Sequence, residues 1–283
     1  MIADAQIQYN MTKAALKNLA FTVKSSLNLM ILNRSGNIKG SGSGVLISYR
    51  QKYFICTVEH NVKKNKNRIA ILTGHRQGDT EITVQPPELS FLENLNVTEL
   101  TAAGLRKALD NPQDANTLDI AFASVQKLDN LIQEKVSLHL RDGSTLEIPK
   151  GKKNIIEIKD ILTIRKNAKY SFSGRIKTRL NAENIFFYAP QLVFGMKLIS
   201  MGQDMIKFDL GYPIADNANF KGCSGAPIFD DKGQLVALVA WGDKDISKSY
   251  IYAFRLDRMI DFIKMMYFFP ALEEAITSRP KNK

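Results

Sequence analysis

The feature that most constrains this chain is a long succession of short β-type segments, each bounded by turn residues. From Ser26 onward, apolar runs of strand length alternate with clusters of Gly, Asn, Asp and Pro, and Lys232-Gly233 is typical of a hairpin turn. This spacing favours an antiparallel barrel or sandwich. The predicted strands include Leu27–Leu32, Val45–Ser48, Tyr53–Val58, Arg68–Leu72, Leu118–Val125, Val136–Ile148, Tyr170–Ile176, Asn184–Tyr188, Lys197–Met201, Ala226–Phe229, Leu235–Trp241 and Tyr250–Phe254.

Three segments break this β pattern. The first 25 residues are predicted as an N-terminal helical extension, because apolar residues recur there at helical spacing. Thr98 is a plausible N-cap for a helix over 99–109, which Asn111-Pro112 ends. Residues 256–283 are predicted as a C-terminal helix and a basic tail. The apolar face of that helix comprises Leu256, Met259, Ile260, Ile263 and Met266.

The composition and the apolar segments of the chain indicate in which cellular compartment the protein is expected. The N-terminus carries Asp4 with no early Lys or Arg and no long apolar run, so we expect no secretory signal peptide. The most apolar late stretch, Met259–Phe269, contains two charged residues and is far shorter than the ~20 residues of a membrane span. Two Cys cannot form a disulfide framework. We therefore expect a soluble, cytoplasmic protein without a membrane span.

The chain is strongly basic. Lys and Arg total 39 against 28 Asp and Glu, for a formal net charge of +11. This excess could attract nucleic acid or another acidic partner. Basic clusters over 63–68 and 150–153 have no aromatic residues between them and match no nucleic-acid motif. We expect nucleic acid not to be the main partner, and keep a basic nucleic-acid-binding protein as an alternative.

Three segments carry the candidate chemistry. The first, Tyr53–Val62, brings His60 to the end of a predicted strand. The second, Thr117–Ala123, places Asp119 at the start of an apolar strand. The third, Lys221–Phe229, sets Ser224 among glycines before another strand. Each segment alone is a weak signal. Their joint occurrence in one β-rich chain is much stronger.

These residue types suit nucleophilic hydrolysis. A serine hydroxyl needs an adjacent base. Histidine, with an ordinary pKa of ~6.5, can accept that proton and return it to the leaving group. A carboxylate orients the imidazole and stabilises its charged form. Backbone N–H groups in a glycine-rich turn around Ser224 could bind the developing oxyanion, each donor contributing roughly 2.7–4 kcal/mol.

These motifs resemble those of the chymotrypsin/trypsin-like serine peptidases, most closely the bacterial trypsin-like group that includes the Deg/HtrA proteases. The resemblance covers about residues 27–255. It is carried by Gly42-Ser43-Gly44-Val45-Leu46-Ile47, Thr57-Val58-Glu59-His60, Leu118-Asp119-Ile120-Ala121, Gly222-Cys223-Ser224-Gly225-Ala226-Pro227 and Ala240-Trp241-Gly242.

The resemblance implies an all-β fold of two antiparallel β-barrels, with the active site in the cleft between them. The first barrel would span 26–130 and carry His60 and Asp119. The second would span 131–255 and carry Ser224. We expect no PDZ domain, unlike in most Deg/HtrA proteins.

The resemblance also implies residue roles. His60 would be the general base, Asp119 the orienting acid and Ser224 the nucleophile. Gly222 and Ser224 would supply the oxyanion hole. The edge Ala240-Trp241-Gly242 would pair with an extended substrate by β-augmentation.

Two positions depart from the digestive members of this family. Cys223 stands where secreted trypsins carry the Asp that binds a newly cut N-terminus, so activation of that kind is doubtful. Ala218 stands where trypsins place an acid to bind Arg or Lys, which favours a small or apolar residue before the cut. Asp216 and Asp243 leave a charged pocket open as an alternative.

Cysteine chemistry is a further alternative. Some viral peptidases of this fold use a cysteine nucleophile followed directly by Gly. Here Cys223 is followed by Ser224, and Ser224 by Gly225, so the register favours the serine. A disulfide between Cys223 and Cys56 would require the fold to bring the two residues together.

The sequence thus predicts an intracellular serine endopeptidase that needs no cofactor or metal and acts on protein or peptide substrates. Because free proteolysis is hazardous in a cytosol, we expect narrow specificity or control by a regulatory protein. A catalytically silent binding or scaffold module on the same fold is the main alternative.

Overall fold

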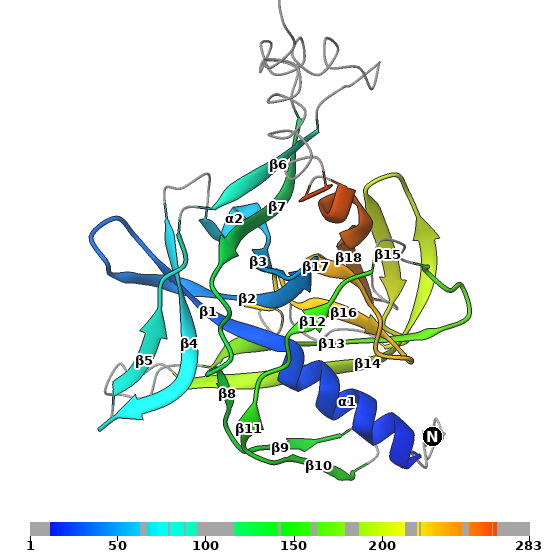
Figure 1. Ribbon diagram of the computed structural model, residues 1–283. Helices are drawn as coiled ribbons and strands as arrows, with labels where there is room; N and C mark the ends of the chain where they lie inside the picture. The colour runs from blue at the N-terminus through cyan, green and yellow to red at the C-terminus, as the bar shows by residue number, and fades with distance from the viewer. Residues whose placement is uncertain are drawn as a thin grey trace, which may run out of the picture.

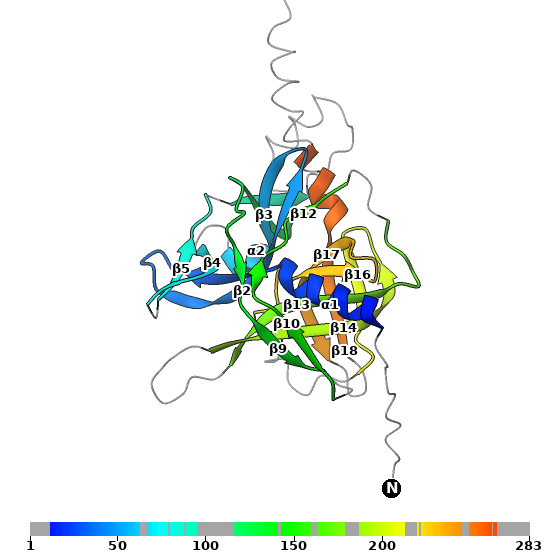
Figure 2. The same cartoon turned by 60° about the horizontal axis from the view of Figure 1, so that its bottom comes forward.

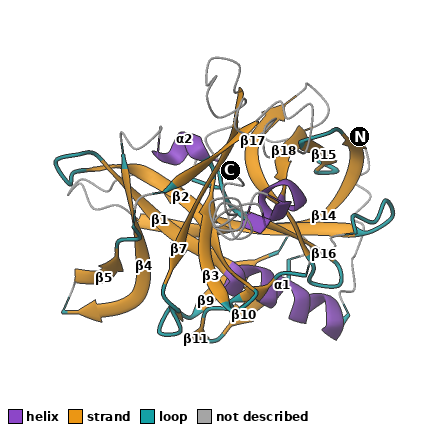
Figure 3. Cartoon of the chain, turned by 45° about the horizontal axis from the view of Figure 1, so that its top comes forward, coloured by secondary structure: helices purple, strands orange, loops and turns teal. Residues whose placement is uncertain are grey.

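A computed structural model describes most of the 283-residue chain. The described residues are 12–62, 67–78, 80–87, 89–94, 116–140, 143–159, 163–178, 187–212, 220, 222–244, 249–261 and 263–264. The predicted helix over 99–109 and the basic tail lie outside them. The described part is built mostly of β-strands, with few helices (Figure 3).

Eighteen strands and two labelled helices follow one another along the described chain (Figure 1). They are α1 (Lys13–Ser25), β1 (Ser26–Leu32), β2 (Ile38–Tyr49), β3 (Lys52–Thr57), α2 (Glu59–Val62), β4 (Arg68–Gln77), β5 (Thr80–Val84), β6 (Ser90–Asn94), β7 (Asn116–Val125), β8 (Ile132–Gln133), β9 (Val136–His139), β10 (Thr145–Ile148), β11 (Gly151–Lys152), β12 (Ile156–Glu157), β13 (Lys169–Thr178), β14 (Phe187–Met201), β15 (Met205–Asp209), β16 (Pro227–Asp230), β17 (Leu235–Lys244) and β18 (Ser249–Arg255).

The strands form two main units. In the C-terminal half, β13-β14-β15-β18-β17-β16 close into an antiparallel barrel. In the N-terminal half, the order is β5-β4-β1-β2-β3-β7-β6, with β12 pairing in parallel with β2. The predicted all-β class is confirmed. The described strands of the first unit, however, make an open sheet, because β5 and β6 at its two ends do not pair with each other.

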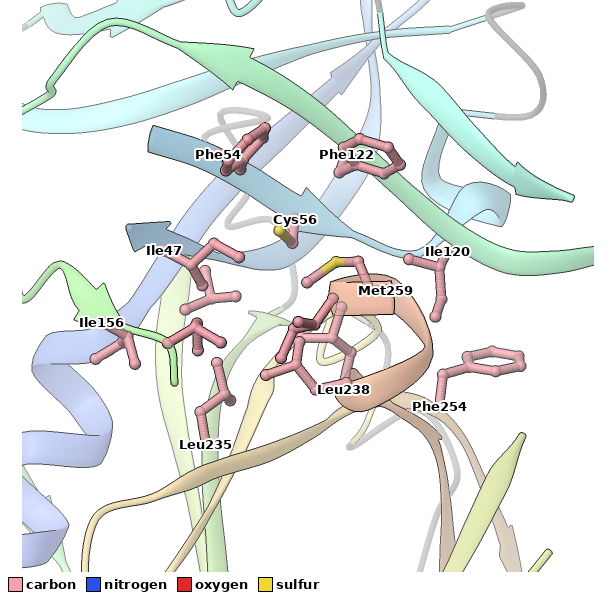
Figure 4. Close-up of a cluster of buried hydrophobic side chains, with 14 of the residues drawn as sticks. Ile47, Phe54, Cys56, Ile120, Phe122, Ile156, Leu235, Leu238, Phe254 and Met259 are labelled. Carbon is pink, nitrogen blue, oxygen red and sulfur yellow. The ribbon is translucent and has the colours of Figure 1, made fainter. Parts of the chain in front are cut away.

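A hydrophobic core joins the two units. Side chains from β2, β3 and β7 meet side chains from β16, β17 and β18, and nearly all of them are less than a tenth exposed. Residues 256–261 and 263–264 are helical and complete this core with their apolar face. Figure 4 shows Met259 of this helix between Cys56 on β3 and Leu238 on β17. The described part of the predicted C-terminal helix therefore packs between the sheet and the barrel.

The N-terminal helix begins later than its predicted apolar pattern. Thr12 caps it, accepting a hydrogen bond from the backbone N–H of Ala15 at 3.2 Å. Its buried side chains belong to the last two turns, and residues 1–11 lie outside the described part. Phe21 packs edge-on against Phe229 on β16, with ring centroids 5.3 Å apart, so the helix covers the barrel (Figure 2).

Two predicted strand boundaries differ from the structure. The run Val136–Ile148 is a hairpin, β9 and β10, since a turn with Gly143 at φ +81° interrupts it. The described end of the run predicted at 184–188 and the run predicted at 197–201 belong to one long strand, β14 (Phe187–Met201), and residues 184–186 lie outside the described part. Gly195 at φ +78° lies opposite a register shift in β13, so this strand continues through an irregularity that hides its sequence pattern.

Candidate active site

His60 and Asp119 are brought together by the pairing of β3 with β7. Thr57 at the end of β3 lies opposite Ala121, so Asp119 stands beside the short helix α2 that carries His60. The Nδ1 atom of His60 is 2.6 Å from Oδ2 of Asp119. The backbone N–H of His60 also donates to Oδ1 of Asp119 at 2.7 Å. These two contacts fix the imidazole relative to its own backbone.

Ser224 lies on the loop over residues 222–226, here called the Ser224 loop, which leads into β16. Its turn requires Gly225 at φ +86°, a conformation that other residues rarely adopt. The Ser224 hydroxyl donates to the carbonyl oxygen of Ala240 at 3.1 Å. Asn61, next to His60, donates from Nδ2 to the carbonyl oxygen of Ser224 at 3.1 Å. The loop therefore rests against the helix that carries the histidine.

The predicted oxyanion donors are the backbone N–H groups of Gly222 and Ser224. Neither group has a hydrogen-bond acceptor among the described residues. The N–H of the following residue, Gly225, is occupied by the carbonyl oxygen of Val239 at 2.8 Å. Gly222 has a φ of +100°. Within the described part of the chain, these two N–H groups are therefore available to donate hydrogen bonds to an anionic oxygen.

The predicted substrate edge lies on β17. Ala240 is fully buried, whereas Trp241 is 46% exposed and stacks on Tyr252 with ring centroids 5.5 Å apart. A Cβ atom at Gly242 would lie at an ordinary van der Waals distance, 3.5 Å, from Cδ1 of the fully buried Ile251. Ala218 lies outside the described residues, and its role stays a prediction.

Both cysteines are free and fully buried. They belong to different hydrophobic cores, Cys56 between the two units and Cys223 inside the barrel. Burial raises the pKa of Cys223 to about 12, and it raises the pKa of Cys56 as well. Such thiols remain protonated near neutral pH and are poor nucleophiles. The disulfide between them that the sequence left open does not form.

The sequence alone did not identify three buried polar residues around the Ser224 loop. Ser43 donates from Oγ to the carbonyl oxygen of Gly222 at 2.7 Å. Thr57 donates from Oγ1 to the carbonyl oxygen of Ser43 at 2.7 Å and accepts from Nδ2 of Asn61 at 3.0 Å. Ser43 and Thr57 lie within the motifs quoted above, but neither motif indicates a contact with the other unit.

The described residues contain neither a candidate metal cluster nor a candidate membrane-spanning helix. No group of three or more His, Cys, Asp and Glu side chains in this part of the chain is arranged to hold a metal ion. No helix within it is both long and apolar enough to cross a membrane.

Comparison with known proteins places the fold. The structure is similar to that of the serine endoprotease from Yersinia pestis, with a TM-score of 0.50 and 13% identity, covering 90% of this chain and 66% of that one. A structure described as that of GrC has a TM-score of 0.49 and 11% identity, covering 88% of this chain and 96% of that one. No family model and no curated protein sequence matches the chain. The fold is thus chymotrypsin-like, with one closed barrel and one open sheet.

Proposed function

We propose that the protein is a trypsin-like serine endopeptidase that hydrolyses peptide bonds through an acyl-enzyme. The observation that carries this proposal is the 2.6 Å contact between His60 and Asp119, together with a serine loop anchored on Asn61, the neighbour of His60. A chymotrypsin-like fold supports it, since the same arrangement of residue types serves acyl transfer on that fold.

The proposed mechanism uses three side chains. Asp119 accepts from Nδ1–H of His60, which leaves Nε2 free to act as a base. The Ser224 hydroxyl turns about χ1 from the Ala240 carbonyl toward the imidazole, gives up its proton and attacks the scissile carbonyl. His60 then protonates the leaving amine, and water completes hydrolysis by the reverse sequence. The N–H groups of Gly222 and Ser224 would stabilise each oxyanion.

The proposed substrate is an extended polypeptide that pairs with β17 from Trp241 onward. On that side of β17, the described strand β16 pairs only as far as Leu238. A preference for a small or apolar residue before the cut, which the sequence favours through Ala218, is also part of this proposal. Cytoplasmic location and control by a partner protein are parts of this proposal that follow from the sequence.

The test is labelling with a fluorophosphonate, which reacts with an activated serine. We expect the wild type to be labelled and Ser224→Ala and His60→Ala not to be, with all three showing the same circular dichroism spectrum. Labelling of Ser224→Ala would contradict the assigned nucleophile. An unlabelled wild type that still binds a polypeptide partner would favour the scaffold module.

A further inference from the structure

The peptide unit between Gly222 and Cys223 is held at both ends. Its carbonyl oxygen accepts from Oγ of Ser43 at 2.7 Å. Its N–H, which belongs to Cys223, donates to the carbonyl oxygen of Phe220 at 3.0 Å. A flip of this unit would therefore break two hydrogen bonds at once, in a place where Ser43 is fully buried.

The peptide unit between Ser224 and Gly225 is held in the same way. Its carbonyl oxygen accepts from the backbone N–H of Ser43 at 2.9 Å and from Nδ2 of Asn61 at 3.1 Å. Its N–H donates to the carbonyl oxygen of Val239 at 2.8 Å. Three donors and acceptors, two of them from the N-terminal sheet, thus fix this unit.

The unit between these two carries the N–H of Ser224. Its carbonyl oxygen, which belongs to Cys223, accepts from the N–H of Ala226 at 2.8 Å. In a trans peptide the N–H and C=O point in opposite directions, so the Ser224 N–H faces away from this turn. Because both flanking units are fixed, the direction of this N–H is determined by its neighbours.

Two of the residues that hold the flanking units, Ser43 on β2 and Asn61 on α2, belong to the N-terminal half and are tightly packed. Asn61 is only 4% exposed. A Cβ at Gly42 would lie 2.6 Å from Nδ2 of Asn61, and a Cβ at Gly225 would overlap the carbonyl oxygen of Ser43. Neither side has room to shift, and Thr57 ties the two together.

We propose that Ser43 and Asn61 are positioning residues that set the direction of the Ser224 N–H across the contact between sheet and barrel. This inference rests on the proposed function, in which that N–H binds the oxyanion. An oxyanion donor acts well only when it is fixed in advance toward the developing charge. The N-terminal sheet would then supply the imidazole and also hold half of the oxyanion hole in place.

The main test compares Ser43→Ala with a matched control, Ser171→Ala. Ser171 shares a buried hydrogen bond, 3.0 Å long, with Thr22 on α1, and neither residue bonds to the Ser224 loop. For Ser43→Ala we expect the fluorophosphonate labelling rate of folded protein to fall roughly 10- to 100-fold. The upper end of this range corresponds to the loss of one oxyanion donor. The pH–rate profile should keep its shape while its plateau falls. Ser171→Ala should label at the wild-type rate.

A second variant guards against misfolding of the first. Asn61→Leu has nearly the same volume and lacks the donor to Ser224 and to Thr57. We expect its labelling rate to fall at least about tenfold, the effect of roughly one hydrogen bond on the Ser224 loop. Wild-type labelling rates in both Ser43→Ala and Asn61→Leu, with both proteins folded, would overturn the inference.

Amide hydrogen exchange separates this inference from the proposed function, since it needs no activity. The N–H groups of Cys223 and Gly225 should exchange faster in Ser43→Ala than in wild type, and at the wild-type rate in Ser171→Ala. If the wild type is not labelled but exchange changes in this way, the peptidase proposal fails and the positioning contact stands. Unchanged exchange in Ser43→Ala would overturn the positioning role itself.

Discussion

The two halves of this molecule are built differently. The C-terminal barrel closes on itself through six strands and encloses its own apolar core. The N-terminal sheet is open in its described part, and its core is completed by neighbouring segments. The closed half carries the serine on a loop, whereas the open half carries the histidine and the carboxylate near strand ends. The candidate site therefore exists only where the halves meet.

The two halves make different contacts with the Ser224 loop. On the barrel side, the Ser224 loop is held by the hydrogen bonds between Val239 and both Gly225 and Ala226. On the side of the N-terminal half, Ser43 and Asn61 hold the same loop. We therefore expect substitutions in the barrel core to act mainly on stability, and substitutions of Ser43 and Asn61 to act mainly on activity.

The largest expected effect tests the open half. Asp119→Asn keeps the shape of the side chain but replaces the carboxylate that faces Nδ1 of His60, which favours the wrong imidazole tautomer. We expect labelling and peptide hydrolysis to fall on the order of 10⁴-fold, with an unchanged melting transition. A loss below tenfold in a folded variant would show that Asp119 does not orient the base.

The next effect tests the shared core. Phe229 on β16 is fully buried and packs against Phe21 of α1. We expect Phe229→Ala to lower the free energy of unfolding by about 3–5 kcal/mol, measured by urea denaturation. A single transition would show that sheet and barrel unfold together. Two separated transitions would show that the halves are independent domains.

A smaller effect tests the helix that covers both halves. Nζ of Lys153 donates to the carbonyl oxygens of Val23 and Ser26 and to Oε1 of Gln133, the last two at 2.5 and 2.6 Å. Lys153→Met removes these charged donors from the end of α1, and we expect a loss of about 2–3 kcal/mol in unfolding free energy. Labelling at 20 °C below the melting point should stay within about twofold of wild type, since Val23, Ser26 and Gln133 are not among the residues that hold the Ser224 loop.

The smallest effect concerns the thiols. Burial raises the pKa values of Cys56 and Cys223, the latter to about 12, so little thiolate forms at pH 8. Iodoacetamide at that pH should leave the folded protein unmodified by mass spectrometry and its fluorophosphonate labelling unchanged. Rapid alkylation of Cys223 with parallel loss of labelling would revive the cysteine alternative.

The sequence predicted the fold class well because strand and turn signals are local. Tyr53–Val58 and Ala226–Phe229 coincide with β3 and β16 within one residue at each end. Local signals misled where a strand bends: Gly195 splits the apparent pattern of β14 although the chain continues as one strand. Local sequence signals also could not predict that the first sheet is open, since closure of a barrel depends on pairing between distant strands.

The site was only partly predictable for the same reason. His60, Asp119 and Ser224 each stand at the edge of a recognisable β run, and the structure brings His60 and Asp119 into contact. No pattern in the sequence indicated the hydrogen bonds of Ser43 and Asn61, because their partners Gly222 and Ser224 are 179 and 163 residues away along the chain. Side-chain to backbone contacts at such separation depend on the docked fold, and a short motif does not encode them.

That separation also matters for synthesis of the protein. A ribosome that has made Ser43 and Asn61 must add more than half of the chain before their partners emerge. Contacts between such distant segments form late, after the costly closure of a long loop. We therefore expect every nascent or truncated chain that ends before residue 222 to be incapable of cutting its surroundings.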